Sequence, residues 1–303
     1  MSSLILLFLC LFLGIVLKKT KLFPENGHLA LNSFVINISL SALALFYIPK
    51  INIELSLIFP IGIAWLNIAF ALLIFSFVGK KLGWTKSLIG AVVMCVGFGN
   101  TSFVGIPVIQ ALFGEEGIKT VMMVDQPGSF VALSTVGIAV ANFNSGAQSS
   151  TSEIIRKIVR FPPFIAFCVA ILLNIFNITV PAEIDTVFEK LGATTVPLAL
   201  VSVGSQLRFE KPGIYSKPLF LGLSFKLILF PLMIFLLYFK IFGQTDEAAQ
   251  ISLLEAAMAP MITAAIIASA HNLEPKLCNL FIGIGIPLSF FTLGLWWIFL
   301  QYF

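Results

Sequence analysis

Two apolar stretches of the chain each carry a polar centre and a proline. The first, residues 97–107, reads GFGNTSFVGIP, and the second, residues 255–263, reads EAAMAPMIT. Proline removes an amide donor from a helix, and a broken helix inside a bilayer is tolerated only beside protein or a water-filled cavity. Two such breaks in corresponding parts of a chain indicate a binding site near the midplane of a transporter.

The residue types at these breaks suit the binding of an anion. Two half-helix N-termini that point at one cavity present free N–H donors and partial positive charge to a carboxylate. The residues that break the helices are Gly99, Gly105, Pro107 and Pro260. We expect substrate contacts from the two breaks and from polar positions of two other spans: Asn100, Thr101, Ser102, Met258, Pro260, Thr263, Ser41 and Ser202. A simple proline kink is the alternative for the second break, and helix packing through small polar residues is the alternative for the two other spans.

Three ionisable residues fall inside apolar stretches, where charge is costly and usually functional. Asp125 and Glu255 lie about 10 Å into their spans, and Lys226 about 12 Å, by the helical rise. A carboxylate at such a depth could bind sodium or carry a proton. The alternatives are a structural ion pair and side chains that reach the interface.

The composition indicates an all-α polytopic membrane protein. The chain is 59% hydrophobic and 11% charged, with a mean hydropathy of +1.04, far above soluble domains. Little sequence is left for a soluble catalytic domain. We count ten hydrophobic stretches, at 3–17, 29–49, 57–78, 86–113, 118–141, 161–178, 186–206, 218–242, 248–270 and 278–300.

The basic residues indicate the orientation. Thirteen Lys and Arg residues lie in loops that follow odd-numbered spans, and four lie on the other side. By the positive-inside rule both termini lie outside the cytoplasm, so we expect a protein of the inner or plasma membrane. The net charge of +4 reports this topology and does not indicate nucleic-acid binding. The four cysteines and two histidines are too scattered for a metal site.

The chain divides into two halves of five spans. We expect a first repeat at 1–141, a cytoplasmic linker with a basic amphipathic segment at 142–160, and a second repeat at 161–303. The prolines of the two breaks are offset by 153 residues, and similar segments of spans two and seven by 156. Because each half has an odd number of spans, the repeats must be inverted, which lets spans four and nine cross.

With these motifs in hand, the chain resembles the auxin efflux carrier family, which includes plant PIN-type carriers and bacterial malonate and other carboxylate permeases. The most specific match is GNTSFVGIP at 99–107. Supporting matches are DQPG at 125–128, VPLALVSVG at 196–204, KLILFP at 226–231 and the segment around Pro260. The resemblance covers essentially all ten spans.

The resemblance implies the crossed-helix fold of bile-acid sodium symporters and sodium/proton antiporters. Spans 1–2 and 6–7 would form a scaffold that usually dimerises, and spans 3–5 and 8–10 a transport domain that moves as an elevator. Asn100 would contact the substrate carboxylate, and Asp125 would sit in a neighbouring support site. Ser41 stands where the family commonly has proline.

We therefore interpret the chain as a secondary active transporter for a small organic anion, such as a mono- or dicarboxylate or an auxin-like acid. Ion coupling is assigned to Asp125, Gln126, Glu255 and Lys226, with a proton or sodium and no other cofactor. The alternatives are a passive anion channel or uniporter and a membrane ligand sensor on the same fold. An intramembrane enzyme is not expected, because no GxSG motif with a partner His is present.

Overall fold

The computed structural model describes residues 2–20, 23–24, 26–52, 54–146, 159–207 and 211–303. Every regular element in these ranges is helical. Long apolar stretches become helices because a helix satisfies its own backbone groups where no water is present. The prediction of an all-helical membrane protein is confirmed. Most of the linker and amphipathic segment expected at 142–160 lies outside the described residues.

The helices follow one another along the chain with short connections. In the first half they are α1 (Ser2–Lys19), α2 (Gly27–Phe34), η1 (Val35–Ser39), α3 (Leu40–Tyr47), η2 (Ile48–Lys50), η3 (Leu55–Leu57), α4 (Ile58–Lys81), α5 (Lys86–Val96), η4 (Thr101–Gly105), α6 (Ile106–Met123), η5 (Val124–Phe130), η6 (Leu133–Gly137) and α7 (Ile138–Ser145). In the second half they are α9 (Pro162–Ile175), α10 (Ala182–Ala193), α11 (Thr195–Gln206), η7 (Gly213–Tyr215), α12 (Ser216–Ser224), η8 (Phe225–Leu229), α13 (Phe230–Ile234), η9 (Phe235–Ile241), α14 (Glu247–Ala256), α15 (Ile262–Ala270) and α16 (Pro275–Gln301).

Within the described residues, six continuous helical segments are long and apolar enough to cross a membrane. They are Gly27–Lys50, Leu55–Lys81, Thr101–Ser145, Ala182–Gln206, Gly213–Ile241 and Pro275–Gln301. Several features make this number smaller than the ten stretches of the sequence. Breaks shorten α5, α14 and α15, α9 has only 14 residues, and the longest segment continues through a turn at Gly114, where φ is +74°. The arrangement of ten spans as an inverted repeat stays a prediction.

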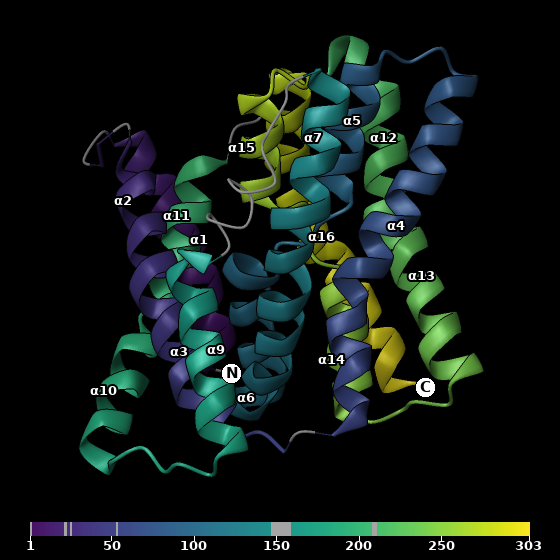
Figure 1. Cartoon of the computed structure of the whole chain (residues 1–303). Helices are drawn as coiled ribbons and strands as arrows, with labels where there is room; N and C mark the ends of the chain where they lie inside the picture. Colours follow the sequence, from purple (N-terminus) through teal and green to yellow (C-terminus); the bar gives the residue numbers. More distant parts are fainter. Residues whose placement is uncertain (1, 21–22, 25, 53, 147–158, 208–210) are drawn as a thin grey trace.

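Two groups of helices lie side by side in Figure 1. The purple α1–α3 lie with the teal and green α9–α11 on the left, where α1 packs on α11 and α3 packs on α9 and α10. On the right, α4 packs on α5 and α14, and at the upper middle α15 packs on α16 and α5. Segments from both halves of the sequence therefore meet in each group. The helix α6 lies between the groups in this view, and α7 packs on α5 and α15.

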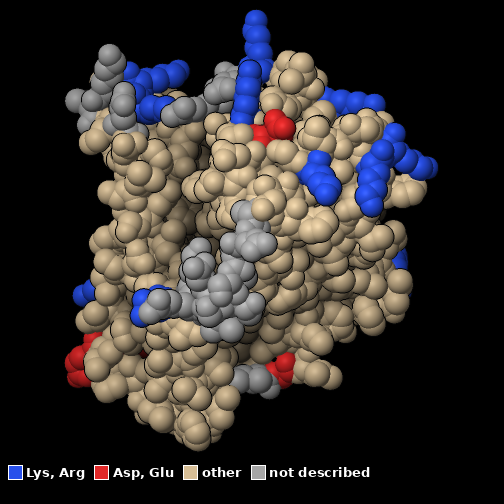
Figure 2. All heavy atoms as spheres, turned by 45° about the horizontal axis from the view of Figure 1, so that its top comes forward, with Lys and Arg blue, Asp and Glu red and all other residues tan. Residues whose placement is uncertain are grey.

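Charge is distributed unevenly between the two ends of the molecule. Both termini lie at the lower end in Figure 1. Figure 2, which turns the upper end toward the viewer, shows most of the visible Lys and Arg side chains around that end. The middle of the molecule presents mainly uncharged atoms, as expected for a surface in contact with lipid.

The contact between α1 and α11 depends on two glycines. A Cβ atom on Gly204 would lie 3.1 Å from the Cα of Gly14 and would overlap the carbonyl oxygen of Leu11. Small residues let helix backbones approach closely in a membrane, where packing and not hydrophobicity drives association. Any side chain at Gly204 must therefore push the two helices apart.

We expect Gly204→Ala to lower the melting temperature of the detergent-purified protein, because overpacking of this kind costs about 1–3 kcal/mol. Gly294→Ala is the matched control, since a Cβ atom at this helical glycine meets nothing within 4 Å. Replacing a free helical glycine by alanine stabilises by up to about 1 kcal/mol. Equal melting temperatures for the two variants would contradict the close α1–α11 contact.

Candidate functional site

The two broken segments cross and bind each other through their backbones. The amide N of Asn100 donates to the carbonyl oxygen of Ala259 at 2.8 Å, and the amide N of Met261 donates to the carbonyl oxygen of Phe98 at 3.1 Å. Gly99 and Pro260 face each other in an isolated antiparallel bridge. These bonds satisfy backbone groups that the breaks would otherwise leave bare inside the membrane.

Asn100 caps one half-helix and keeps a free donor. Its Oδ1 accepts a hydrogen bond from the amide N of Phe103 at 3.1 Å, as an N-cap residue does. The residue is 3% exposed, and its Nδ2 has no hydrogen-bond partner among the described residues. The π-helical turn η4 follows directly and leads into α6, whose first turn holds Pro107. The amide of Asn100 is thus fixed in place with its N–H donors available to a ligand.

Asp125 lies in η5 beside this cap and is surrounded by donors. Its Oδ1 accepts from the hydroxyl of Thr101 at 2.5 Å and from the hydroxyl of Ser102. Its Oδ2 accepts from Nε2 of Gln126 at 2.8 Å. Asp125 is 3% exposed. Three donors, two of them from η4, stabilise the carboxylate and tie η5 to the N-terminal end of the half-helix.

Lys226 and Glu255 lie behind the crossing and do not pair with each other. The Nζ of Lys226 donates to the carbonyl oxygen of Ala256 at 2.7 Å, at the C-terminus of α14, where a cation complements the partial negative charge of the helix end. Both carboxylate oxygens of Glu255 lack a hydrogen-bond partner in the described part of the chain. The ion pairs in which both partners are described residues are Lys50–Asp185 and Lys119–Glu116.

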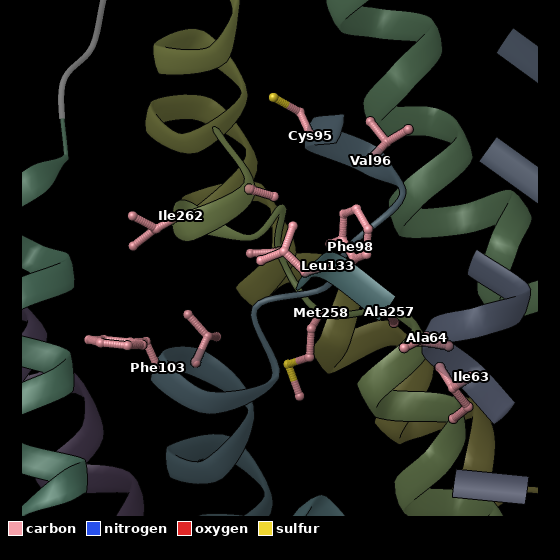
Figure 3. Close-up of a cluster of buried hydrophobic side chains, with 14 of the residues drawn as sticks. Ile63, Ala64, Cys95, Val96, Phe98, Phe103, Leu133, Ala257, Met258 and Ile262 are labelled. Carbon is pink, nitrogen blue, oxygen red and sulfur yellow. The ribbon is translucent and has the colours of Figure 1, made fainter. Parts of the chain in front are cut away.

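Apolar side chains hold the crossing rigidly. Figure 3 shows Val96, the last residue of α5, and Phe98 of the first broken segment in one buried cluster with Ala257 and Met258 of the second and with Leu133. Leu133 is 3% exposed, and the other four residues are 0% exposed. Such close packing fixes the backbone bridge and the cap of Asn100 relative to each other.

A cavity of about 710 Å³ opens beside the crossing. Its polar part includes Asn100, Ser102, Asp125, Gln126 and Thr263. Its remaining wall is mostly apolar and includes Ile36, Leu40, Phe103, Phe130, Leu133, Ile138, Phe161, Met261, Ile262, Ile266 and Ile267, with Arg160 and His271 also in the lining. The cavity therefore combines a small polar region at two half-helix N-termini with a large apolar wall.

The other residues predicted for the site lie in different places. Thr101, Met258 and Pro260 are buried at the crossing and outside the cavity lining. The hydroxyl of Ser202 donates to Oδ1 of Asn32 at 2.5 Å between α11 and α2, and that of Ser41 donates back to the carbonyl oxygen of Asn37. In this conformation neither serine belongs to the cavity. Among the described residues no group of three or more His, Cys, Asp or Glu is arranged to hold a metal ion.

The aromatic wall was not expected from the sequence. Phe130 and Phe161 stack with ring centroids 3.8 Å apart and both line the cavity, as does Phe103. The position of Phe103 in the cavity wall could have been predicted, because it lies about one helical turn after Asn100 and so on the same side of the helix. Phe130 and Phe161 are far apart in sequence, and only the packing of α9 against η5 brings them together.

We expect Thr101→Val to lower the free energy of unfolding by about 2 kcal/mol, since it removes a buried hydrogen bond to a charged acceptor. Thr292→Val is the control: its buried hydroxyl donates only within its own helix, to the carbonyl oxygen of Ser289 at 3.2 Å. Thermal unfolding of both variants in detergent measures the difference. A Thr101→Val protein as stable as the control variant would contradict the role of this bond.

Comparisons with known proteins give the family. Residues 1–297 match the family model described as membrane transport protein. An uncharacterized transporter of Methanothermobacter thermautotrophicus is 26% identical, over 94% of this chain and 93% of that protein. One of Methanocaldococcus jannaschii is also 26% identical, over 99% of each chain, and one of Escherichia coli K12, YfdV, is 23% identical, over 94% of this chain and 93% of that protein. The chain thus belongs to the membrane transport protein family, the auxin efflux carrier family that its motifs indicated.

Proposed function

We propose that this transporter moves a small organic anion and binds the carboxylate of that anion at the crossing of the two broken segments. The observation that carries the proposal is the amide of Asn100. It is 3% exposed, it lines a cavity of about 710 Å³, and its Nδ2 donor has no partner among the described residues. A buried donor of this kind is costly unless a ligand satisfies it.

The surroundings of Asn100 favour an anion as that ligand. The half-helix that begins at Thr101 and the helix α15, which begins at Ile262, both direct their N-termini toward the crossing. Helix N-termini stabilise negative charge. The hydroxyl of Ser102 and the side chain of Thr263 add polar groups at the same place. The apolar wall then accommodates the carbon body of a mono- or dicarboxylate or of an auxin-like acid.

We further propose that transport proceeds by an elevator movement. The group α1–α3 with α9–α11 would form a scaffold, which dimerises with a second copy, and the remaining helices would carry the site across the membrane. Two cavities, of about 710 and 840 Å³, support this proposal, because each is lined by residues of both groups. A smaller cavity of about 340 Å³ lies between α3 and α6.

Ion coupling completes the proposal. Asp125 and Gln126 lie directly at the site, and Glu255 and Lys226 lie behind it. Buried ionisable groups inside membrane segments are the expected carriers of a coupling proton or sodium ion. The alternatives are a passive channel and a ligand sensor on the same fold. In a channel the anion would follow its own gradient, and in a sensor it would only bind. In neither case would an ion gradient drive accumulation of the anion.

The binding proposal is tested by thermal stabilisation of the detergent-purified protein with malonate, other carboxylates and indole-3-acetate. An acid present at 100 times its Kd should stabilise the protein by about 2.7 kcal/mol. Asn100→Asp should fold, because its carboxylate can still accept from the amide N of Phe103, but it should lose the stabilisation, since a negative oxygen replaces the free donor.

Asn100→Ala is the second variant in this experiment. It should lose both the stabilisation and about 1 kcal/mol of unfolding free energy, because the helix cap is removed. An acid that stabilises Asn100→Asp as strongly as the wild type would place the anion elsewhere and would overturn the proposed site.

We also propose that the basic end of the molecule faces the cytoplasm, so that both termini lie outside it. With Cys168, the exposed native cysteine, replaced by serine, a cysteine at Glu183 should react with a membrane-impermeant maleimide in intact cells. A cysteine at Lys217 should react only after permeabilisation. Both of these positions are exposed. The reverse labelling pattern would invert the orientation.

A further inference from the structure

Three ionisable side chains are buried around the crossing, and their partners differ. Asp125, Glu255 and Lys226 are 3%, 1% and 0% exposed. Asp125 accepts three hydrogen bonds, and Lys226 donates to the carbonyl oxygen of Ala256. Glu255 alone of the three has no hydrogen-bond partner among the described residues, at either carboxylate oxygen. The proposed anion site does not by itself require a buried carboxylate without hydrogen bonds at position 255.

Glu255 touches the half-helix that carries the anion site. A Cβ atom built on Gly105 would lie 2.5 Å from Oε1 and 2.7 Å from Oε2 of Glu255. The absence of a side chain at Gly105 therefore leaves the space that the carboxyl group fills. Gly105 ends the π-helical turn that begins next to Asn100. The carboxyl group of Glu255 therefore contacts the chain one helical turn away from Asn100, whose amide is proposed to bind the substrate. A change in its charge occurs close to that donor.

The charges at the crossing do not balance when all three groups are ionised. Two carboxylates then face one ammonium, and a substrate carboxylate would add a further negative charge. An ionised carboxylate buried without hydrogen bonds is very costly. Asp125 has donors that stabilise its negative charge, whereas Glu255 has none among the described residues. The smallest change that removes the excess charge is a proton on Glu255.

A sodium ion is the alternative to a proton at this position. A hard cation needs several oxygen ligands around it. The carbonyl oxygen of Ala256, at the end of α14, is already bound by Nζ of Lys226 at 2.7 Å. Oδ1 of Asn67 on α4 and Oγ of Ser252 on α14 are buried oxygens without a hydrogen-bond partner among the described residues, so the experiment below compares proton and sodium gradients.

The elements packed against α14 bring few other titratable groups near Glu255. Those elements are α4, α6, α13, α16 and η9. Asp125 and Lys226 are the charged groups that act on Glu255, and the hydroxyl of Tyr238 on η9 is held by the carbonyl oxygen of Phe59. The other titratable side chains of these elements lie near helix ends or just after the turn of α6 at Gly114: Lys80, Lys81, Lys240, Lys276 and Cys278 at the ends, and Glu115, Glu116 and Lys119 after the turn.

We propose that Glu255 is the proton-binding group of this transporter, and that its protonation and the binding of the organic anion favour each other. The proposal rests on the proposed function. Linkage is reciprocal: if a proton on Glu255 tightens anion binding, anion binding must also take up a proton. The proton enters from the side where the anion binds and leaves with it on the other side. Anion and proton therefore move together, as a symport.

The experiment uses wild-type protein, Glu255→Gln and Glu247→Gln in proteoliposomes, with radiolabelled malonate and indole-3-acetate as probes. Glu247 is the matched control, because it lies on the same helix as Glu255 but is exposed in its first turn. Exchange without any gradient is measured first, at two pH values, with protein-free liposomes as the blank. Accumulation driven by an inward proton gradient is measured next.

Wild type and Glu247→Gln should show an apparent KM that rises with pH, by up to about tenfold per pH unit for one linked proton, and should accumulate the anion. In Glu255→Gln the neutral amide resembles the protonated acid, so exchange should persist with a KM independent of pH, and accumulation should be lost. Accumulation by Glu255→Gln at the wild-type level would overturn the proposal. Accumulation driven by sodium and not by protons would overturn it as well.

A measurement on the wild type alone keeps the proposal testable if Glu255→Gln fails to fold. Adding the exchanged anion to weakly buffered proteoliposomes should make the outside more alkaline as protons enter with it. Anion uptake without proton uptake would overturn the proposal. The failure of the proposed function would look different, because wild-type protein would then exchange neither malonate nor indole-3-acetate.

Discussion

Two backbone hydrogen bonds between the broken segments, from Asn100 to Ala259 and from Met261 to Phe98, are the constraint on which the rest of the molecule depends. No water is present in a bilayer core to satisfy exposed amides. Each break is therefore tolerated because a carbonyl oxygen of the other broken segment accepts a hydrogen bond from one of its backbone amides. This mutual dependence brings two segments about 150 residues apart into one place and aligns the half-helix ends around a single cavity.

The charges around the crossing follow from those helix ends. The C-terminus of α14 has its partial negative charge complemented by Lys226, and the donor side chains of η4 are directed at Asp125. The N-terminal ends and the amide of Asn100 remain for a ligand. A site of this kind needs no metal to attract an anion, because oriented backbone dipoles supply the positive potential. Glu255 has no donor among the described residues, and in the proposed mechanism it is the group whose charge changes as the site fills.

Much of the site could be predicted because its signals are local. Asn100, Ser102, Asp125, Gln126 and Thr263 were all expected from polar or charged residues next to prolines and glycines in apolar sequence, and all line the cavity. Ser41 and Ser202 were expected there and lie elsewhere. A helix shows its polar residues in sequence, but its rotation about its own axis is set by its neighbours. The stacked pair Phe130 and Phe161 was missed for the same reason, since phenylalanine suits lipid, core and cavity equally well.

The sequence by itself determined that this chain is helical, lies in a membrane and breaks two of its helices, because hydropathy and proline act within a few residues. Only the tertiary structure decided which groups meet. Lys226 binds the carbonyl oxygen of Ala256 and not the carboxylate of Glu255, although the sequence allowed a buried ion pair just as well. The two possible partners of Lys226 are on adjacent residues of α14, so differences of a few ångströms decide which one its Nζ contacts. Those distances are set by how α14, η8 and η4 pack together.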